Sequence, residues 1–271
     1  MSKIVWDAVG ERKYETGIKK GVLYPQVSGA YPNGVGWNGL TSFEASPDGG
    51  EANDFWADDT KYLSLRSREN FKGTLGAYMY PDEFAECDGS AFVANGVKIG
   101  QQTRKAFGLS YVSTLGNDTE GDDYGYILHL IWGATVAPSQ RTYNTINDNP
   151  EPTEMSWEVD TVPTEVGTIG GVAYKAFAHM EIDSTKADAT QLAALEDILY
   201  GTENTQPYLP LPAAVLAMFG GTGTTYTYTA VENPTGNPTA LGYYVRSGND
   251  FILSTDTTVI TGTTYYTRSS T

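Results

Sequence analysis

The sequence has a single cysteine, Cys87, which excludes a framework of internal disulfides. It also has no run of about 18 apolar residues, the length that a membrane-spanning helix needs. Its first residues are charged from the third position onward and form no apolar stretch of signal-peptide length. These absences predict a protein that is made and folded in a cytosol, with no membrane partner.

Basic residues are scarce as well. The chain has 17 Lys and Arg against 33 Asp and Glu, so its formal net charge is -16. Proteins that wrap nucleic acid or bind anionic membranes need basic patches, and this balance argues against both classes. The composition is compatible with a surface past which DNA slides without binding.

Residues for nucleophilic catalysis are few. The two histidines, His129 and His179, lie in the apolar runs ILHLIW and AFAHME, which is typical of strand residues that face a neighbour or solvent. No Gly-x-Ser-x-Gly turn is present. Cys87 lies between Glu86 and Asp88, whose negative charges raise a thiol pKa and so disfavour a nucleophile. The sequence therefore predicts no nucleophilic enzyme.

The same scarcity applies to metal and cofactor sites. Zinc sites need clustered Cys and His, and the two histidines are far apart in the sequence. Asp118, Glu120 and Asp122 have the alternate spacing of a calcium loop, but the glycine, Gly121, comes too early and the twelfth position is His129. No phosphate-binding or dinucleotide-binding glycine motif occurs. We predict no metal, no cofactor and no catalytic residue. The alternative of a glycosidase that uses a pair of carboxylates stays open, because the sequence does not show which of the 33 acids lie close together in space.

The chain has 271 residues, enough to bury a core without disulfides, and many apolar residues alternate with polar ones. That pattern predicts two hairpins, at residues 61–80 and 105–132, the second with a turn at LGNDTEGDDYG. Further strands are expected at residues 154–160 and 174–182. From Trp37 to Thr60 the composition is loop-like, and we expect a long loop at residues 40–60. Its segment 44–59 has six acids and no Lys or Arg.

Helix signals are few. One helix is expected to begin at Ser184 or Thr185 and to end at Gly201, with a buried face formed by Leu192, Leu195 and Leu199. A second, short helix is expected at residues 212–219, with proline at its first position. Many strands and one good helix make the predicted fold class mainly β.

The composition changes at Gly220 and Gly221. After this point the chain is rich in Thr and Tyr and has few charges, with short apolar runs separated by turn residues. We therefore expect two domains, residues 1–219 and a small all-β appendage at residues 220–271. The stretches GTTYTY and GTTYYT begin 39 residues apart and fit either one module plus the start of a lost copy, or chance similarity.

Six stretches between residues 4 and 218 are informative through their sequences and through the order in which they follow one another. They are WDAVGERKYETGIKKGVLYPQ, YPDEFAECDGS, IGQQTRKAFGLSYVSTLGND, GYILHLIWGATVAPSQRTYNTINDNPE, SWEVDTVP, and EDILYGT followed by LPLP. Together they resemble the major tail tube protein of long, non-contractile-tailed bacteriophages of the siphophage type, especially phages of Gram-positive hosts. The appendage resembles small Thr- and Tyr-rich modules of phage virion proteins.

The resemblance implies a tail-tube β-sandwich or barrel with one flanking α-helix. It implies a structural virion protein, not an enzyme, whose subunits pair inner-sheet strands into hexameric rings and stack the rings into a hollow tail tube. Viral DNA passes through the lumen on ejection into the host, without specific binding. The implied partners are other copies of the chain, a tape-measure protein, and tail-tip and tail-terminator proteins, in a virion tail assembled in the host bacterial cytoplasm.

The resemblance also suggests where assembly contacts lie. The arm at residues 1–14 and the loop at residues 44–59 are expected to connect rings, with the aromatic candidates Trp6, Tyr14, Trp37, Phe43, Phe55 and Trp56. The two predicted hairpins are expected to form the inner sheet, with the lumen candidates Ser64, Arg66, Thr74, Tyr78, Ser110 and His129. Excess carboxylate in the lumen is expected to repel DNA phosphates. The appendage is expected on the tube exterior.

Two other classes of function stay open. The aromatic-rich, Thr-rich composition also fits a carbohydrate-binding β module or an adhesin of a virion or cell surface. A carboxylate pair would fit a glycan-degrading enzyme. Rings or tubes would indicate the tail protein, a monomer retained on polysaccharide would indicate the binding module, and release of product from a glycan would indicate the enzyme.

Overall fold

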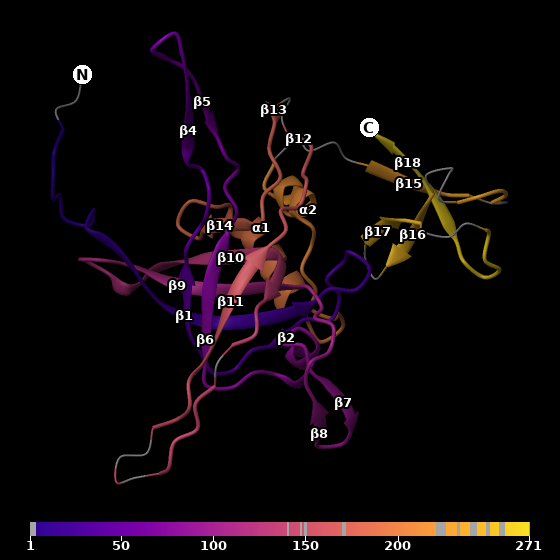
Figure 1. Cartoon of the computed structure of the whole chain (residues 1–271), viewed down its shortest axis with the longest axis horizontal. Helices are drawn as coiled ribbons and strands as arrows, with labels where there is room; N and C mark the ends of the chain where they lie inside the picture. The colour runs from indigo at the N-terminus through magenta and orange to yellow at the C-terminus, as the bar shows by residue number, and fades with distance from the viewer. Residues whose placement is uncertain are drawn as a thin grey trace.

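The computed structural model describes residues 4–139, 141–146, 148, 151–169, 172–220, 226–231, 234–238, 243–247, 250–254 and 258–270. Over these residues antiparallel β-strands dominate, together with two α-helices. The predicted mainly-β fold is therefore confirmed. An eight-stranded sheet forms the body of the protein, and hairpins and an N-terminal arm project from it (Figure 1).

The large sheet is built around two long antiparallel strands, β9 (Phe107–Asn117) and β10 (Gly121–Val136). This pair confirms the hairpin predicted at residues 105–132. The sheet order is β2-β1-β9-β10-β11-β6-β3, and β14 also pairs with β10. The bounds of the other strands are β1 (Lys13–Pro25), β2 (Val35–Gly36), β3 (Leu40–Ala45), β6 (Lys72–Ala77), β11 (Met155–Thr161) and β14 (His179–Asp183).

One edge of β10 is shared by two partners, and a bulge around Gly133 separates them. Residues 127–131 pair with β14, and residues 134–136 pair with β11. The register toward β9 shifts between Ile131 and Ala134, and Gly133 has a φ of 63°. Through this bulge β10 passes from one layer of strands into the other.

Two apolar clusters hold the layers together. One lies between β1, β9 and β10 on one side and β6 and β11 on the other, and it includes Leu109 and Trp157. The second lies on the opposite face of β1, β9 and β10, where Trp132 and its neighbours pack against helical residues such as Leu195. Strands β9 and β10 are therefore covered on both faces, and the fold is a β-sandwich with helices on one side.

The two helices lie close to their predicted positions, at α1 (Ala189–Tyr200) and α2 (Pro212–Met218). Helix α1 ends at Gly201, which has a φ of 75°, and buries the three predicted leucines, Leu192, Leu195 and Leu199. No helix among the described residues is long and apolar enough to cross a membrane.

The predicted start of α1 at Ser184 or Thr185 is wrong. The N-cap is Asp188, whose Oδ1 accepts hydrogen bonds from the backbone N–H groups of the second and third helical residues, both at 3.0 Å. Thr185 instead donates its N–H and its hydroxyl to Asp183, in the turn that follows β14. The carboxylate at position 188 therefore satisfies the helix start that the hydroxyls were expected to satisfy.

The hairpin predicted at residues 61–80 does not form. Strand β5 (Thr60–Arg66) pairs instead with β4 (Ala52–Ala57), and the two make a separate sheet. Strand β6 pairs with β11 and β3. The long loop predicted at residues 40–60 is therefore wrong where β3 and β4 run, because β3 joins the large sheet and β4 forms one arm of a projecting hairpin.

The two later strand predictions fare differently. The alternation at residues 154–160 is confirmed as β11, where Met155, Trp157 and Val159 are buried and the intervening residues are exposed. The strand predicted at residues 174–182 begins only at His179, as β14.

Smaller elements complete the chain. A 3-10 helix, η1 (Asp82–Glu86), precedes the hairpin of β7 (Ala91–Ala94) and β8 (Val97–Ile99), and β12 (Thr168–Ile169) pairs with β13 (Val172–Ala173). The C-terminal residues form a four-stranded sheet of order β15-β18-β16-β17. Its strands are β15 (Tyr226–Ala230), β16 (Tyr244–Ser247), β17 (Asp250–Leu253) and β18 (Tyr265–Ser270).

The two similar Thr- and Tyr-rich stretches meet within this C-terminal sheet. The first contributes to β15 and the second to β18, and these strands are antiparallel partners. The second stretch is therefore not the start of a lost copy of the module. Residues 221–225, which include part of the predicted glycine hinge, lie outside the described residues.

Candidate assembly surfaces

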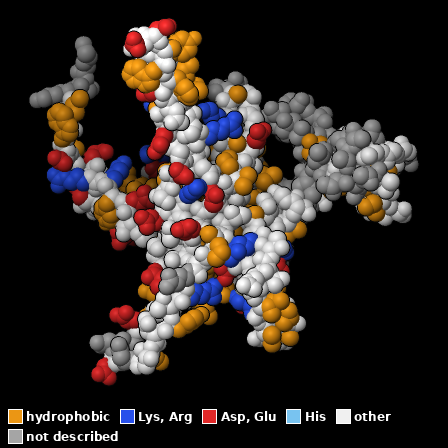
Figure 2. Space-filling model, viewed as in Figure 1, with side chains coloured by type: hydrophobic (Ala, Val, Ile, Leu, Met, Phe, Trp, Pro, Cys, Tyr) orange, Lys and Arg blue, Asp and Glu red, His pale blue; other side chains and the backbone are white. Residues whose placement is uncertain are grey.

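The N-terminal arm, residues 4–12, carries apolar side chains outside the body of the protein. Ile4, Val5, Trp6 and Val9 are all exposed, Trp6 by 76%. In Figure 2 hydrophobic side chains of this arm stand apart from the rest of the surface. Exposed apolar groups on a projecting segment indicate a contact with another molecule.

Two hydrogen bonds hold the arm and the start of β1 against the turn between β9 and β10 and the start of β10. The backbone N–H of Gly10 donates to Asp118 Oδ1 at 2.9 Å, and the Tyr14 hydroxyl donates to Asp122 Oδ1 at 2.8 Å. The bond to Asp122 raises the pKa of Tyr14. Of the three acids with calcium-like spacing, Asp118 thus anchors the arm and Asp122 binds the hydroxyl of Tyr14 within the chain.

The hairpin of β4 and β5 is exposed along its whole length. Across it Lys61 Nζ contacts Asp54 Oδ1 at 2.8 Å, which lowers the pKa of Asp54. Figure 2 shows the hydrophobic side chains gathered toward its tip. An isolated two-stranded hairpin is marginally stable in water, so this one is expected to gain a partner. Its exposed large apolar side chains are Phe55, Trp56, Tyr62, Leu63 and Leu65.

Two further projections have the same character. The hairpin of β7 and β8 exposes Phe92, Val93, Val97 and Ile99. The segment that follows β10 exposes Tyr143 and Ile146, by 79% and 83%. The exposed large apolar residues are thus concentrated on projections.

Two of the aromatic residues predicted for assembly lie inside the chain. Trp37 is 4% exposed, and its Nε1 donates a hydrogen bond to the carbonyl of Met79 at 2.9 Å. Phe43 is partly buried and contacts the rings of Phe71 and Tyr111. The prediction of an assembly contact is therefore wrong for Trp37, and the ring of Phe43 is engaged within the chain.

The structure does not bring the lumen candidates onto one surface. Ser110 and His129 are buried on β9 and β10, so the prediction that they line a lumen is wrong. The reason is that these strands are covered by β6 and β11 on one face and by the helices on the other. Ser64 and Arg66 lie on the β4–β5 hairpin, outside the large sheet.

Thr74 lies on an exposed acidic face that the site prediction missed. The strand register places it between Glu44 of β3 and Glu158 of β11, and Asp160 lies beside Lys72 in the next row. We call this outer side of β3, β6 and β11 the acidic face. The sequence held a signal for it, because the alternation of β11 already puts its acids opposite Trp157. Tyr78, just after β6, is 50% exposed.

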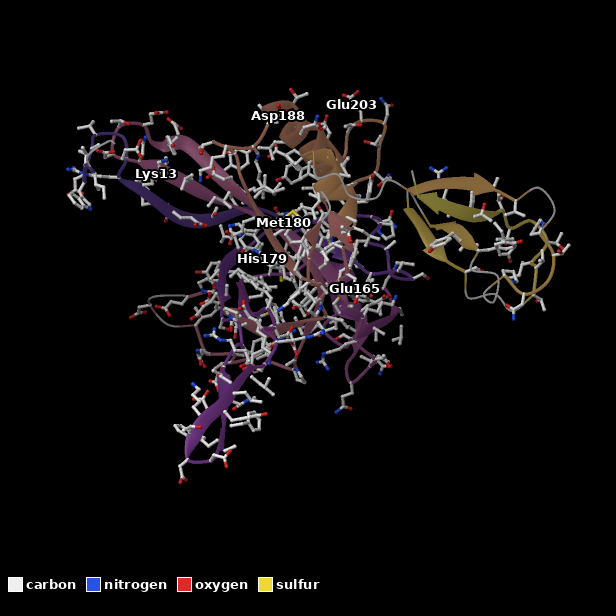
Figure 3. The ribbon with its side chains drawn as sticks, turned by 90° about the horizontal axis from the view of Figure 1, so that it is seen from above. Lys13, Glu165, His179, Met180, Asp188 and Glu203 are labelled. Atoms are coloured by element: carbon white, nitrogen blue, oxygen red, sulfur yellow. The ribbon has the colours of Figure 1, made fainter. Side chains whose placement is uncertain are left out.

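The two histidines, 50 residues apart in the sequence, contact each other. His129 Nδ1 and His179 Nε2 are 3.3 Å apart, and the rings are nearly parallel. Burial lowers the pKa of both imidazoles, and the charge of His129 further lowers that of His179, to about 4. His179 lies in the body of the molecule (Figure 3). The inference that the histidines are too distant to cluster is therefore wrong, because β14 pairs with β10.

The cysteine belongs to the core. Cys87 lies in the cluster between the two layers of strands. Burial raises the pKa of its thiol to about 12, and the charge of Glu86 adds to this effect, as the sequence predicts for acidic neighbours. The thiol is protonated at neutral pH.

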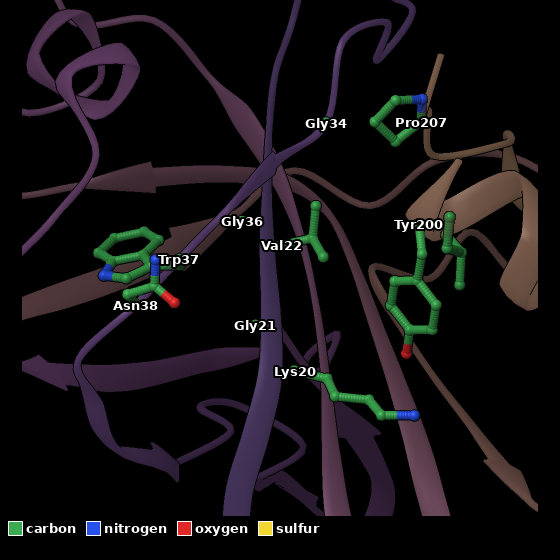
Figure 4. A pocket seen from close by; sticks show the side chains of 10 residues that line it. Lys20, Gly21, Val22, Gly34, Gly36, Trp37, Asn38, Tyr200 and Pro207 are labelled. Carbon is green, nitrogen blue, oxygen red and sulfur yellow. The ribbon is translucent and has the colours of Figure 1, made fainter. Parts of the chain in front are cut away.

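A groove of about 430 Å³ lies between β1 and the end of α1 (Figure 4). Its lining includes Lys20, Trp37, Asn38 and Tyr200. The ammonium group of Lys20 lies over the Tyr200 ring at 5.5 Å, and the buried Tyr200 hydroxyl has no hydrogen-bond partner. These lining residues do not include a nucleophile with a neighbouring base.

No protein-family model and no curated protein matches this chain. Two solved structures share a limited likeness: the cap that terminates the tube of the anti-feeding prophage, and the six-fold symmetrised baseplate of the same particle. Each is 9% identical, covers 68% of this chain and has a TM-score of 0.32; the alignments cover 96% and 99% of those chains. At that TM-score the likeness does not establish a shared fold or function.

Proposed function

We propose that this chain is the major tail tube subunit of a long, non-contractile-tailed bacteriophage. It closes into hexameric rings and stacks them into a hollow conduit for DNA ejection. Its partners are other copies of the chain, the tape-measure protein, and the tail-tip and tail-terminator proteins. The six sequence stretches between residues 4 and 218 that resemble tail tube proteins support this proposal, as does a β-sandwich with helices on one side.

The observation that carries the proposal is the set of apolar projections. The β4–β5 hairpin alone exposes five large apolar side chains, and the arm adds Trp6. Burying one such side chain at a subunit contact contributes roughly 1.5–3 kcal/mol. Repeated around a ring and between rings, contacts of this size support a polymer, whereas a monomer gains nothing from them.

The acidic face is our candidate for the lumen wall, in place of the buried β9–β10 pair. It presents Glu44, Glu158 and Asp160, with Lys72 as a nearby base. Strand β3 ends the sheet, so its outer edge is open to a strand of the next subunit. A ring closed in this way surrounds the DNA with carboxylates, which do not bind phosphate.

We place the C-terminal sheet, residues 226–270, on the tube exterior as a separate appendage. Its described strands pair only with one another. Tyr265 is fully buried within it, and Tyr243 packs against that ring. Tyr265 therefore stabilises the small module and does not present its ring to a sugar.

Replacing both Trp56 and Leu65 by serine is expected to abolish tube formation and leave the subunit folded. These side chains are 67% and 58% exposed, so the change removes contacts to other subunits and not core packing. Negative-stain electron microscopy over a concentration series measures assembly, and circular dichroism checks the fold. Wild-type rings or tubes with external knobs, and only monomers of the variant, are the expected results.

The matched control is Val162→Ser. Val162 is 68% exposed but lies between β11 and β12, away from the hairpin, and this variant should assemble normally. Normal tubes from the double variant would show that the β4–β5 hairpin makes no contact that assembly needs. A wild-type protein that stays monomeric even with a tail-tip initiator would overturn the tail proposal, and its retention on polysaccharide would favour the binding module.

Replacing Glu44 and Glu158 by lysine is expected to slow DNA ejection from assembled virions without preventing assembly. Lysines on the lumen wall would bind phosphates and release counterions, so the delay should shrink as salt rises. Ejection rates at two salt concentrations measure this. The control pair, Glu165→Lys and Glu203→Lys, makes the same charge change at exposed positions elsewhere. Equal rates for the two double variants would contradict the placement of the lumen.

A further inference from the structure

Three potential metal ligands converge on one face at the junction of β10 and β14. His129 of β10 is directly opposite Glu181 of β14 in the strand register. His179 precedes Glu181 by two residues, and alternate residues of a strand share a face. Two strands that are distant in the sequence thus bring together two imidazoles and a carboxylate.

The ligand atoms have the separations that one small cation requires. His129 Nδ1 is 3.3 Å from His179 Nε2 and 3.8 Å from Glu181 Oε1, and the last two atoms are 3.9 Å apart. The point equidistant from the three atoms is about 2.1 Å from each. Zinc bonds to histidine nitrogen and carboxylate oxygen are about 2.0–2.2 Å long. A tetrahedral ion lies slightly above the plane of the three atoms, so it fits after small side-chain shifts and without movement of the strands.

The far side of His129 is held in the way that metal-bound histidines usually are. Its Nε2 lies 2.9 Å from Ser113 Oγ and 3.3 Å from Glu15 Oε1, and the Ser113 hydroxyl donates to the same Glu15 oxygen at 2.5 Å. With the Nε2 proton directed to these oxygens, the lone pair of Nδ1 faces the other two ligands.

Aromatic packing fixes both imidazole rings. Tyr111 stacks on His129 with ring centroids 4.5 Å apart, and Phe71 stacks on His179 at 4.3 Å. The histidine side chains are 7% and 17% exposed, whereas that of Glu181 is 57% exposed. The cluster is therefore rigid on its inner side and open to solvent beside the carboxylate.

We infer that His129 Nδ1, His179 Nε2 and Glu181 Oε1 bind one divalent transition-metal ion of the zinc class. Two imidazoles and one carboxylate suit zinc, cobalt or nickel, whereas calcium and magnesium prefer oxygen ligands alone. The fourth position faces solvent and takes a water molecule. The ion joins β14 to β10 and so stabilises the sandwich; this role is independent of whether the chain forms tubes.

Metal titration of the untagged full-length protein tests the site. We expect one Zn²⁺ per chain by calorimetry, and a tetrahedral Co²⁺ absorption band that Zn²⁺ abolishes. The chain has two histidines, so both imidazole signals in nitrogen-15 spectra should shift on Zn²⁺ addition. Glu181→Gln should weaken binding at least tenfold, and Glu15→Gln about tenfold through the orientation of His129.

The control variant is Glu165→Gln, an exposed carboxylate outside the cluster, which should bind as the wild type does. Because Glu181 is exposed, its variant is expected to keep the metal-free melting temperature of the wild type, which separates ligand loss from misfolding. Three results would each overturn the site: no Zn²⁺ or Co²⁺ uptake, imidazole signals that stay fixed while Zn²⁺ binds, or equal affinities for Glu181→Gln and Glu165→Gln.

Discussion

Replacing Asp88 by alanine is expected to lower the free energy of unfolding by about 3 kcal/mol. The Asp88 side chain is 10% exposed and accepts hydrogen bonds from Arg141 Nη2 at 2.6 Å and Trp157 Nε1 at 2.9 Å. Alanine would leave the indole N–H and one side of a largely buried guanidinium without this partner. Denaturant unfolding followed by tryptophan fluorescence measures the difference.

The comparison variant is Glu86→Ala. Glu86 forms an ion pair with Lys105, but both side chains are more than half exposed, so its loss should change stability by less than about 0.5 kcal/mol. A double-mutant cycle with Arg141→Ala isolates the contact between Asp88 and Arg141. A coupling energy near zero, or equal losses of stability in Asp88→Ala and Glu86→Ala, would show that the buried Asp88 carboxylate does not stabilise the fold through Arg141.

Asp88 also shows what the sequence could and could not predict. As a neighbour of Cys87 it predicts a raised thiol pKa. The pKa is raised, chiefly by burial, and the charges of Glu86 and Asp88 act in the same direction. Its bonds to Arg141 and Trp157 join residues 53 and 69 positions away, and only the fold brings them together. The sign of a charge effect between sequence neighbours can therefore be predicted from the sequence, whereas the burial of the thiol and the partners of a buried charge cannot.

Elements with one buried and one exposed face were predictable. Strand β11 and helix α1 each have a clear period, because each packs one side against the core. The β9–β10 pair was predictable from its turn. Strands β4 and β5 are exposed on both faces. Alternation indicates β5 as a strand, but no buried face indicates its partner, so the predicted pairing with residues 72–80 is wrong. If this hairpin packs against another subunit, its buried face forms only in the assembly, which explains why the single chain shows none.

The site residues depended most on tertiary structure. Aromatic type alone did not distinguish Trp37, which is buried, from Trp56, which is exposed. Likewise, His129 and His179 become neighbours only through the pairing of β14 with β10. An apolar strand that contains a polar residue is therefore compatible with a lumen position, a core position or a ligand cluster, and the strand pairing decides among them.

Replacing Gly133 by alanine is expected to lower the free energy of unfolding by about 2–5 kcal/mol. Gly133 has a φ of 63°, a backbone conformation that residues with a side chain rarely adopt. An added Cβ would also overlap with the carbonyl oxygen of Val162. That overlap falls where Val162 N–H bonds to the Gly133 carbonyl at 3.0 Å, beside the paired part of β11. Equilibrium unfolding in denaturant measures the loss.

Gly121 supplies a matched control on the same strand. Its φ of 61° is nearly the same, but no atom lies within 4 Å of an added Cβ, so Gly121→Ala should cost only the backbone strain, about 1–2 kcal/mol. The excess at Gly133 then measures the close approach of β10 and β11 where β10 changes layers. Equal losses of stability in Gly133→Ala and Gly121→Ala would contradict this interpretation. The close approach of β10 and β11 at Gly133 would then not contribute to the stability of the sandwich.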